Sequence, residues 1–212
     1  MALLTKENRK RVCESLLKEY PQAQCALDYD SEYHLLVAVM LSAQTTDISV
    51  NKVTPKLFEL APDAYAMCRL SQGELEDVIR QIGLYRNKAN SILTMSKVLC
   101  DEYKGQVPGE YEKLIALPGV GRKTANVVLA EAFGKQRIAV DTHVFRLANR
   151  IGFVKENDVV KTEEALMKVL PEDIWVKMHH ALIFHGRNCC TARNPHCSVC
   201  CIAGYCKRNG LQ

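Results

Sequence analysis

Thiol side chains are concentrated at the end of this 212-residue chain, where they could bind a metal. Of its ten cysteines, six fall within residues 189–206, whereas the other four are scattered through segments with helical periodicity. Separations of six, two and five residues relate four of the six, namely Cys190, Cys197, Cys200 and Cys206. Four thiolates suit either zinc or an iron–sulfur cluster, and the spacing alone does not distinguish the two. Because no secretion signal is recognisable, local metal ligation is favoured over a disulfide framework, with Cys189 and Cys201 left as spare thiols.

A glycine turn followed by basic residues could bind an anion. The segment LPGVG turns too tightly for side chains at both Gly119 and Gly121, because glycine alone combines positive φ with a close backbone approach. It leads into a helix expected over residues 122–133, whose unpaired N–H groups and dipole favour negative charge. An ordinary helix connection would explain the turn alone. Arg122 and Lys123 follow it directly, and they favour phosphate as the ligand.

Lys123 and Asp141 are the candidates for covalent and charge chemistry. An amine is the nucleophile that leaves a Schiff base, and lysine supplies one. To attack near neutral pH its ammonium must lose a proton, which requires partial desolvation or neighbouring cations such as Arg122. Asp141 follows the apolar run IAV and fits a helix N-cap, where its carboxylate would stay ionised. From these residues alone, a solvated surface lysine and a simple cap are the favoured interpretations.

The elements that must position these residues are helices. Apolar residues recur with a period near 3.6 from end to end, which predicts an all-α fold. Ser71 and Glu74 form a capping box at the start of one helix, and Gly83 is expected to stop it. Pro55 lies inside another helical segment, residues 47–60, and predicts either a kink or a split there.

An internal repeat predicts two helical hairpins. The segments EDVIRQIGLYRNKANSIL from Glu76 and EKLIALPGVGRKTANVVL from Glu112 align without gaps, and seven positions offset by 36 are identical. Two copies of helix, glycine turn and helix are expected, although two amphipathic hairpins can also match by chance. The second copy has Lys123 where the first has Asn87, so the two copies differ at the candidate nucleophile.

Composition excludes several classes of protein. With 48% hydrophobic and 25% charged residues the chain can bury a core, which argues against disorder and allows one or two domains. No stretch approaches the roughly 18 to 20 apolar residues of a membrane span, so no membrane association is expected. A net charge of +4 permits a nucleic-acid partner without requiring one.

Together the motifs resemble those of the endonuclease III family of DNA glycosylases. LPGVGRKTA resembles that family's helix-hairpin-helix, and VDTHVFRLANR resembles the segment that follows it. The resemblance extends through LSAQTTD, IGLYRNKA and the cysteine tail, almost end to end. It implies two helical domains with a DNA cleft between them. Residues 25–135 would form a six-helix domain, and residues 1–24 with 136–212 a discontinuous helical domain with the cluster loop.

The same resemblance implies a bifunctional base-excision-repair enzyme, a DNA glycosylase that is also an apurinic/apyrimidinic-site lyase. It would remove oxidised pyrimidines and cleave the abasic site by β-elimination through a Lys123 Schiff base, with Asp141 as the essential aspartate. The family's cysteine spacing implies a [4Fe–4S] cluster rather than zinc. The implied partner is double-stranded DNA with damaged pyrimidines or abasic sites. We expect a monomer, associated with the nucleoid in the cytoplasm of a bacterium.

Opening the duplex calls for further residues, because the target base must be flipped out and the gap filled. The family inserts a glutamine and a leucine at two of the motifs, which assigns Gln44 and Leu84 to these roles. Without the resemblance, Gln44 could be a loop or C-cap residue and Leu84 a core contact. The other expected DNA contacts lie in the hairpin, the segment after it and the cysteine loop: Gly119, Gly121, Arg122, His143 and Arg193. A buried structural role for His143 is an equal alternative.

Two rival functions differ from this one at specific residues. A sister glycosylase, such as an adenine-mismatch enzyme, shares the aspartate, hairpin and cluster but normally replaces the lysine and adds a C-terminal domain. A noncatalytic DNA-binding module would need only the hairpin. Lys123 argues against the first rival, and the pair of Lys123 and Asp141 argues against the second.

Overall fold

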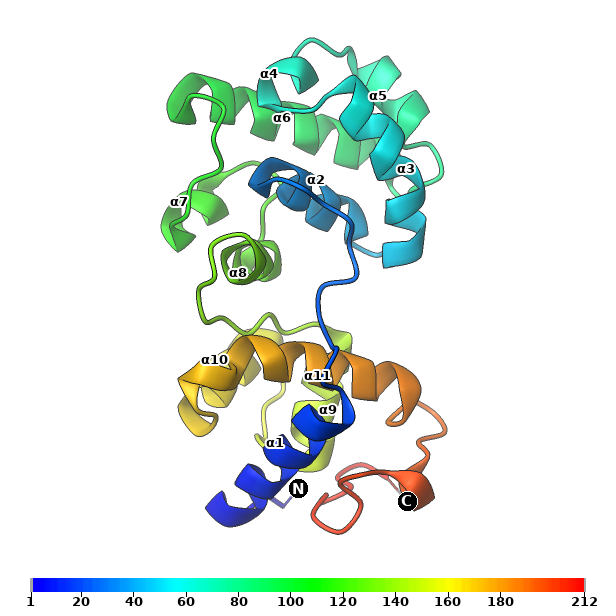
Figure 1. The fold of residues 1–212 in the computed structure, drawn as a ribbon, viewed down its shortest axis with the longest axis vertical. Coiled ribbons are helices and arrows are strands. Elements are labelled where there is room, and N and C mark those ends of the chain that lie inside the picture. Colours follow the sequence, from blue (N-terminus) through cyan, green and yellow to red (C-terminus); the bar gives the residue numbers. More distant parts are fainter. Residues whose placement is uncertain (1, 212) are drawn as a thin grey trace. The chain divides into compact units, whose positions relative to one another are not determined.

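The computed structural model describes residues 2–211, which are helical with irregular connections and contain no strand (Figure 1). The predicted all-α fold is confirmed. Within that range no helix is both long and apolar enough to cross a membrane. The chain divides into two compact units. Residues 26–135 are called the hairpin unit, and the residues up to 25 with those from 136 onward are called the cysteine unit.

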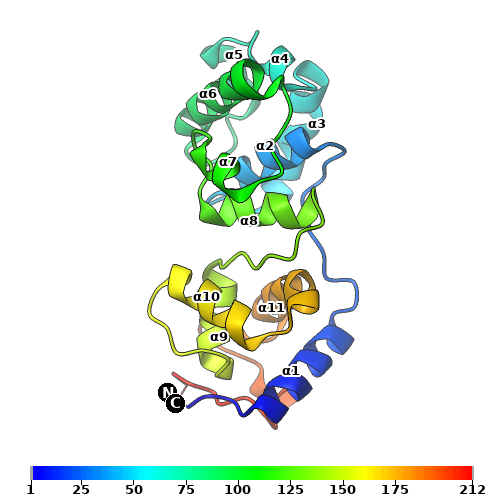
Figure 2. The ribbon, with the colours of Figure 1, turned by 90° about the vertical axis from the view of Figure 1, so that its left-hand side faces the viewer.

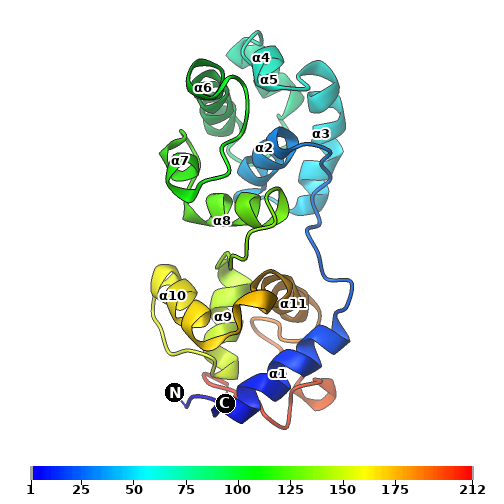
Figure 3. The ribbon, with the colours of Figure 1, turned by 60° about the vertical axis from the view of Figure 1, so that its left-hand side comes forward.

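The hairpin unit is built around a buried helix. Tyr33–Leu41 of α2 are all buried, as expected for a helix that is apolar on every side. Figures 1 and 3 show α2 in the middle of the unit, with α6 on one side and α8 on the other. Where six helices were expected, this unit has seven helical segments: α2 (Glu32–Ser42), α3 (Asp47–Leu60), α4 (Ala64–Met67), α5 (Gln72–Val78), α6 (Tyr85–Tyr103), α7 (Tyr111–Ala116) and α8 (Arg122–Glu131).

The cysteine unit joins the two ends of the chain. The Ala2 N–H donates to Asn209 Oδ1 at 2.9 Å, and Figure 2 shows the two ends side by side. Helix α11 packs against both α1 and α9, so a late helix closes a core begun by the first one. The helices of this unit are α1 (Lys6–Glu19), α9 (Thr142–Ile151), α10 (Val159–Val169), η1 (Glu172–Ile174), α11 (Trp175–Asn188) and η2 (Cys197–Val199).

Both copies of the sequence repeat are helical hairpins, α5–α6 and α7–α8, as predicted. The capping box of Ser71 and Glu74 is also confirmed. The expectation for Gly83 is wrong, because α5 ends at Val78 and the left-handed residue of this turn is Leu84, with φ +59°. The chain leaves the helix early because Ile79 and Ile82 both turn into the core, at 0% and 1% exposure.

Helix α3 runs without interruption past Pro55. The predicted alternative of a split at this position is therefore wrong. The helix begins instead at the Thr46 cap, whose hydroxyl accepts from the Ser49 N–H at 3.2 Å. Burial of Val50 and Leu57 on either side of the proline stabilises the helix enough to offset the hydrogen bond that proline cannot donate.

Candidate functional site

The turn between α7 and α8 is fixed by one of its two glycines. Gly119 has φ +75°, and a Cβ there would lie 2.7 Å from Ser91 Cβ and 3.0 Å from Met40 Cε. Ser91 belongs to α6 and Met40 to α2, so the turn approaches both helices as closely as a glycine backbone allows. Gly119 therefore seats the hairpin on the rest of its unit.

Gly121 has a different role from the one expected. Its φ is −92°, and a Cβ built on it would have no atom within 4 Å, so a tight fit requires no glycine here. Gly121 is the N-cap of α8, and it offers no side-chain oxygen to the first N–H groups of that helix. Gly121 is exposed and has no side chain, so it leaves room for an anion to approach the start of the helix.

Lys123 lies in the first turn of α8, directly after Arg122, and its side chain is exposed. The sequence predicts either partial burial of Lys123 or a neighbouring cation. Within the hairpin unit Lys123 is not buried, but Arg122 is a cationic neighbour in the sequence. A lysine in a first helical turn also adds to the positive end of the helix dipole. The start of α8 thus combines a helix N-terminus that has no side-chain cap with two cationic residues.

The two predicted wedge residues share a rare backbone conformation. Gln44 has φ +56° and Leu84 has φ +59°, and neither is glycine. Leu84 is 57% exposed at the start of α6, which excludes the alternative of a core contact within this unit. Gln44 is exposed in the loop between α2 and α3. A Cβ on Gly83 would lie 3.9 Å from the Gln44 carbonyl oxygen and 3.7 Å from Thr45 Oγ1, so the two turns are neighbours.

A buried lysine that the sequence reasoning missed lies beneath these turns. Lys88 is 8% exposed, and its Nζ donates to the carbonyl oxygens of Leu41 at 2.8 Å and Ala43 at 2.6 Å. It also donates to Thr45 Oγ1 at 2.9 Å. Burial lowers the pKa of the Lys88 ammonium, and these three oxygens stabilise its charge.

Asp141 is the N-cap of α9, as predicted, and belongs to the cysteine unit, whereas Lys123 belongs to the hairpin unit. Its Oδ1 accepts from the Val144 N–H at 2.8 Å. Its side chain is only half-buried, which leaves carboxylate surface beyond the cap bond. One carboxylate can thus cap the helix and still present negative charge.

His143 is half-buried on the first turn of α9. This exposure is intermediate between that of a residue that contacts phosphate and that of a buried structural histidine, the two alternatives expected for it. Burial, with the nearby Arg146 and Arg187 guanidinium groups, lowers the pKa of His143 below its ordinary value. Arg146 Nη2 lies 3.2 Å from His143 Nδ1 and donates to the carbonyl oxygens of Gly186 and Cys190. His143 is thus a neutral side chain held next to the end of α11, where the cysteine tail starts.

The cysteine tail folds around a small pocket. Five of its six cysteines line this pocket, the exception being Cys201, which is exposed. The lining cysteines are Cys189, Cys190, Cys197, Cys200 and Cys206. Their sulfurs form a set of soft donors around one cavity, so the residues present fit a thiolate-held metal cluster.

Donors to sulfur support the same conclusion. Arg150 Nη1 lies 3.5 Å from Cys190 Sγ and also donates to the Thr191 carbonyl oxygen at 2.7 Å. The Arg208 N–H donates to Cys206 Sγ at 3.4 Å. Hydrogen bonds to ligand sulfurs offset the negative charge of thiolates. Arg150, on α9, therefore holds the start of the tail and neutralises a predicted ligand at once.

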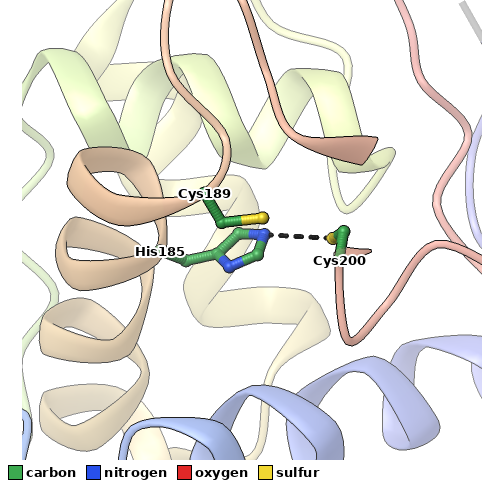
Figure 4. Close-up of side chains that lie close together, drawn as sticks. All are labelled: His185, Cys189 and Cys200. Carbon is green, nitrogen blue, oxygen red and sulfur yellow. Dashed lines mark hydrogen bonds between the residues drawn. The ribbon is translucent and has the colours of Figure 1, made fainter. Parts of the chain in front are cut away.

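A histidine joins this group, and the sequence reasoning missed it. His185 Nε2 lies 3.5 Å from Cys200 Sγ (Figure 4). Its Nδ1 lies 3.0 Å from the Tyr20 hydroxyl oxygen. The donor atoms of His185, Cys189 and Cys200 all lie within 4.8 Å of one another. Cys189, expected to be a spare thiol, thus lines the pocket, whereas Cys201 does not.

Two of the missed residues left a signal in the sequence. Lys88 falls at helical spacing from Ile92 and Met95, which are buried, and a lysine on an apolar stripe requires internal acceptors. Arg150 likewise follows the buried Leu147 by three residues on α9. Arg193, by contrast, is exposed in the cysteine loop as expected for a residue that binds DNA phosphate.

Comparison with known proteins decides between the rival families. Residues 37–172 match the HhH-GPD superfamily of base excision DNA repair proteins, and residues 190–206 match the iron–sulfur binding domain of endonuclease III. Endonuclease III of Haemophilus influenzae is 46% identical over 204 residues, covering 96% of this chain and 97% of that protein. The chain belongs to the endonuclease III family. The enzyme of Escherichia coli K12 is 45% identical over the same shares of the two chains.

Solved structures of endonuclease III agree with this membership. A trapped covalent endonuclease III–DNA intermediate and a non-covalent endonuclease III–DNA complex each superpose with a TM-score of 0.93. Each is 44% identical and covers 97% of both chains. As a family member this protein is a base-excision-repair DNA glycosylase with apurinic/apyrimidinic lyase activity that acts on duplex DNA. The family match also gives the protein a [4Fe–4S] cluster, and the matched iron–sulfur domain, residues 190–206, contains cysteines that line the thiol pocket.

Proposed function

We propose that Lys123 is the nucleophile of this endonuclease III and that its substrates are oxidised pyrimidines. The Lys123 amine attacks C1′ of the damaged nucleotide, and the glycosidic C–N bond breaks as the base leaves with the bonding electrons and a proton. The sugar ring of the resulting aminal then opens as the C1′–O4′ bond breaks and O4′ takes the second proton of the amine nitrogen, which leaves an imine. The imine loses a C2′ proton, and the 3′ phosphate leaves by β-elimination. Water finally releases the lysine from the sugar.

The observation that carries this proposal is the position of Lys123. It is an exposed amine in the first turn of a helix that has no side-chain cap, directly after a hairpin turn seated on its unit by Gly119. A phosphate on the N–H groups of that turn would bring the neighbouring sugar to the lysine. Exposure of the amine leaves it accessible to a sugar that approaches from solution.

Asp141 is proposed to stabilise the cationic sugar and to relay the proton lost by the amine. Its carboxylate accepts a backbone N–H at the start of α9, and this bond fixes the position of one carboxylate oxygen. A carboxylate held in place before the positive sugar develops meets the requirement for electrostatic stabilisation of a transition state.

The remaining proposed contacts divide between duplex opening and phosphate binding. Gln44 and Leu84 are proposed to insert into the duplex, both being exposed and in strained turns. Gly119, Gly121 and Arg122 would bind phosphate at the hairpin, with His143 and Arg193 binding phosphate from the cysteine unit. Support comes from solved 44% identical endonuclease III structures that are DNA complexes.

We further propose that the hairpin unit and the cysteine unit are the two domains of the enzyme. In this assignment the hairpin unit, which begins one residue later than the domain expected over residues 25–135, supplies Lys123 and the wedge, and the cysteine unit supplies Asp141 and the cluster. Cys190, Cys197, Cys200 and Cys206 would hold the cluster, because they line one pocket and the matched iron–sulfur domain begins and ends at the first and last of them. When bound, the cluster supplies a rigid cross-link for the loop that carries Arg193. We propose that the enzyme acts as a monomer in the bacterial cytoplasm.

Borohydride trapping on a panel of duplexes, each with a different damaged base, tests the proposed nucleophile. The wild-type enzyme should give a covalent adduct with duplexes that contain oxidised pyrimidines. Lys123→Gln should bind the same duplexes but release base several orders of magnitude more slowly and give no adduct, because a carboxamide cannot form a Schiff base.

Lys113→Gln is the matched control, since Lys113 is an exposed lysine in the other helix of the same hairpin and pairs only with Glu110 among the contacts of its side chain. It should trap like the wild type. Adduct formation by Lys123→Gln at the wild-type rate would show that another amine is the nucleophile. Trapping only on duplexes with damaged purines would contradict the substrate class.

A further inference from the structure

Lys88 contacts both turns that carry the proposed wedge residues. Its ammonium binds the carbonyl oxygen of Ala43 and the hydroxyl of Thr45, the two residues on either side of Gln44. Its backbone N–H donates to the Leu84 carbonyl oxygen at 3.1 Å. This backbone bond is the first i→i−4 bond of α6 and does not depend on the side chain, so the Lys88 side chain ties the Gln44 loop to the helix that starts at Leu84.

The strain in these turns requires such a restraint. Of the non-glycine residues with positive φ in the described range, Gln44 and Leu84 are two, and both belong to turns that Lys88 contacts. Side chains disfavour the left-handed region, so a residue stays there only when its surroundings hold it. Lys88 provides charge-assisted hydrogen bonds at the carboxyl end of α2, where a positive charge also interacts favourably with the helix dipole.

We propose that Lys88 is a positioning residue that holds Gln44 and Leu84 in one preorganised wedge for opening the duplex. The inference rests on the proposed insertion of those two residues. Lys88 itself is buried, so it acts through its hydrogen bonds and not by touching DNA. Its effect should therefore appear in the step that opens the duplex and be small where no stack has to be opened.

Two substrates separate these steps. One is a duplex with an oxidised pyrimidine, and the other is a single strand that already contains an abasic site. In Lys88→Met, which keeps the length of the apolar stem, base release from the duplex should fall by about 10- to 100-fold, the factor expected when charge-assisted hydrogen bonds are lost. Strand cleavage at the single-stranded abasic site should stay close to the wild-type rate. A fluorescent base analogue opposite the lesion should report the same loss of duplex opening.

Two further variants make the result decisive. Thr45→Val removes one of the three ammonium contacts at nearly constant volume, and it should reduce duplex activity by a smaller factor in the same direction. It also decides the question if Lys88→Met does not fold. Lys97→Met, an exposed lysine on the same helix, should leave both activities unchanged.

Equal losses on the two substrates, or no loss on either, would overturn the role of Lys88. Failure of the underlying function is distinguishable. If Gln44→Ala and Leu84→Ala open and process the duplex normally, the proposed wedge is wrong whatever Lys88 does. If those variants are defective and Lys88→Met is not, only the positioning role fails.

An independent observation concerns two thiols of the hairpin unit, away from the cysteine tail. Cys68, at the end of α4, and Cys100, on α6, have their Sγ atoms 3.7 Å apart. Cys68 is exposed and Cys100 is half-buried. Rotation of these side chains could bring the sulfurs to the roughly 2 Å of a disulfide bond, since the two atoms are already in contact.

We infer that Cys68 and Cys100 form a reversible modification site for low-molecular-weight disulfides. The Cys68 thiolate attacks the reagent disulfide, which releases one reagent thiolate and leaves a mixed disulfide on Cys68. The Cys100 thiolate then attacks the Cys68 sulfur and releases the second reagent thiol. Two protein thiols are oxidised, one reagent disulfide is reduced, and the protein's two protons pass to solvent or to the released thiolates.

The exposure of the two thiols sets this order. Burial, with a contribution from the neighbouring Cys68, raises the pKa of Cys100 to about 11, so Cys100 is the less reactive thiol toward a reagent in solution. Within the mixed disulfide it needs no encounter with a second molecule. The finished bond would tie α4 to α6 and enclose the chain segment that contains Leu84.

Oxidised glutathione on the cluster-loaded enzyme, followed by alkylation, digestion and mass spectrometry, is the test. The expected product in the wild type is a Cys68–Cys100 linked peptide that a reducing agent releases. In Cys100→Ser the reaction should stop at a glutathione adduct on Cys68. Recovery of both thiols as alkylated peptides, or of a persistent glutathione adduct on Cys68 in the wild type, would overturn the inference.

Discussion

The two glycines of the hairpin turn should differ in how the same substitution affects the stability of the fold. Gly119→Ala places a methyl group 2.7 Å from Ser91 Cβ and 3.0 Å from Met40 Cε, at φ +75°. Gly121→Ala places one where no atom lies within 4 Å, at φ −92°. The first variant therefore tests the packing of the turn against α2 and α6. The second tests whether DNA phosphate binds at the turn.

The expected free energies of unfolding differ by several kcal/mol. A side chain in the left-handed region costs about 1–2 kcal/mol. Overpacking against Ser91, whose Cβ is fixed by the α6 backbone, adds about 1–3 kcal/mol. Gly119→Ala should thus lose ~2–5 kcal/mol, a large part of the ~5–15 kcal/mol that stabilises an ordinary domain. At Gly121, the reduced entropy of the unfolded chain and the poorer N-cap nearly cancel, so the change should stay within about 0.5 kcal/mol.

Anaerobic guanidinium unfolding followed by circular dichroism measures the first effect, and fluorescence anisotropy with undamaged duplex measures the second. We expect Gly121→Ala to fold normally but to bind undamaged and damaged DNA about 10-fold more weakly, because backbone contacts to phosphate carry no sequence information. Gly119→Ala should lose both stability and binding. Normal DNA binding by Gly121→Ala, or equal destabilisation of the two variants, would refute this account of the turn.

Three other predictions follow from single contacts. Asp141→Asn should keep the cap of α9 and its affinity for lesion DNA while losing turnover, and a matching loss of thermal stability would show that the carboxylate is mainly structural. Anaerobic Cys201→Ser should retain about four irons per chain by metal analysis and keep its visible absorption, whereas Cys197→Ser should not. Stoichiometric zinc without iron in the wild type would contradict both expectations. Because burial raises the pKa of Cys13 to about 12, this thiol stays protonated and should resist iodoacetamide near pH 8 in the folded enzyme. Rapid alkylation would show that α1 opens locally.

Local rules predicted much of the fold because they act within a few residues. The capping box at Ser71, the cap at Asp141 and the repeat of two helical hairpins are each set by neighbouring side chains, and the structure has them where the sequence placed them. The all-α class follows from apolar periodicity in the same way. At Pro55 the local rule failed, because packing on both sides of α3 outweighed the missing hydrogen bond.

The contacts within the site depended on distant residues and were less predictable. Lys88 binds oxygens of residues 41–45, which lie more than 40 residues away in the sequence. The residues next to Lys88 therefore could not predict these partners. The sequence pattern also predicted that a side chain would not fit at either hairpin glycine. In the structure a Cβ would contact neighbouring atoms only at Gly119. Which thiols line the cluster pocket was likewise decided by the fold of the tail, since Cys189 and Cys201 each flank a predicted ligand and only Cys189 faces the cavity.

Two of the proposed functional residues lie at helix starts that lack a side-chain cap, a feature that α7 and α11 share. In the described chain, α1, α2, α3, α5 and α10 each begin with a Ser, Thr or Asp whose side chain accepts a backbone N–H. The second helices of both hairpins, α6 and α8, begin without such a bond, at Leu84 and Gly121. An absent cap gives up about 1 kcal/mol of stability. At α8 the loss is explained if a DNA phosphate takes the place of the missing cap. At α6 it is explained if the N-cap position holds Leu84 because this residue enters the duplex. Asp141 is the intermediate case, a cap whose own charge is proposed to take part in the reaction.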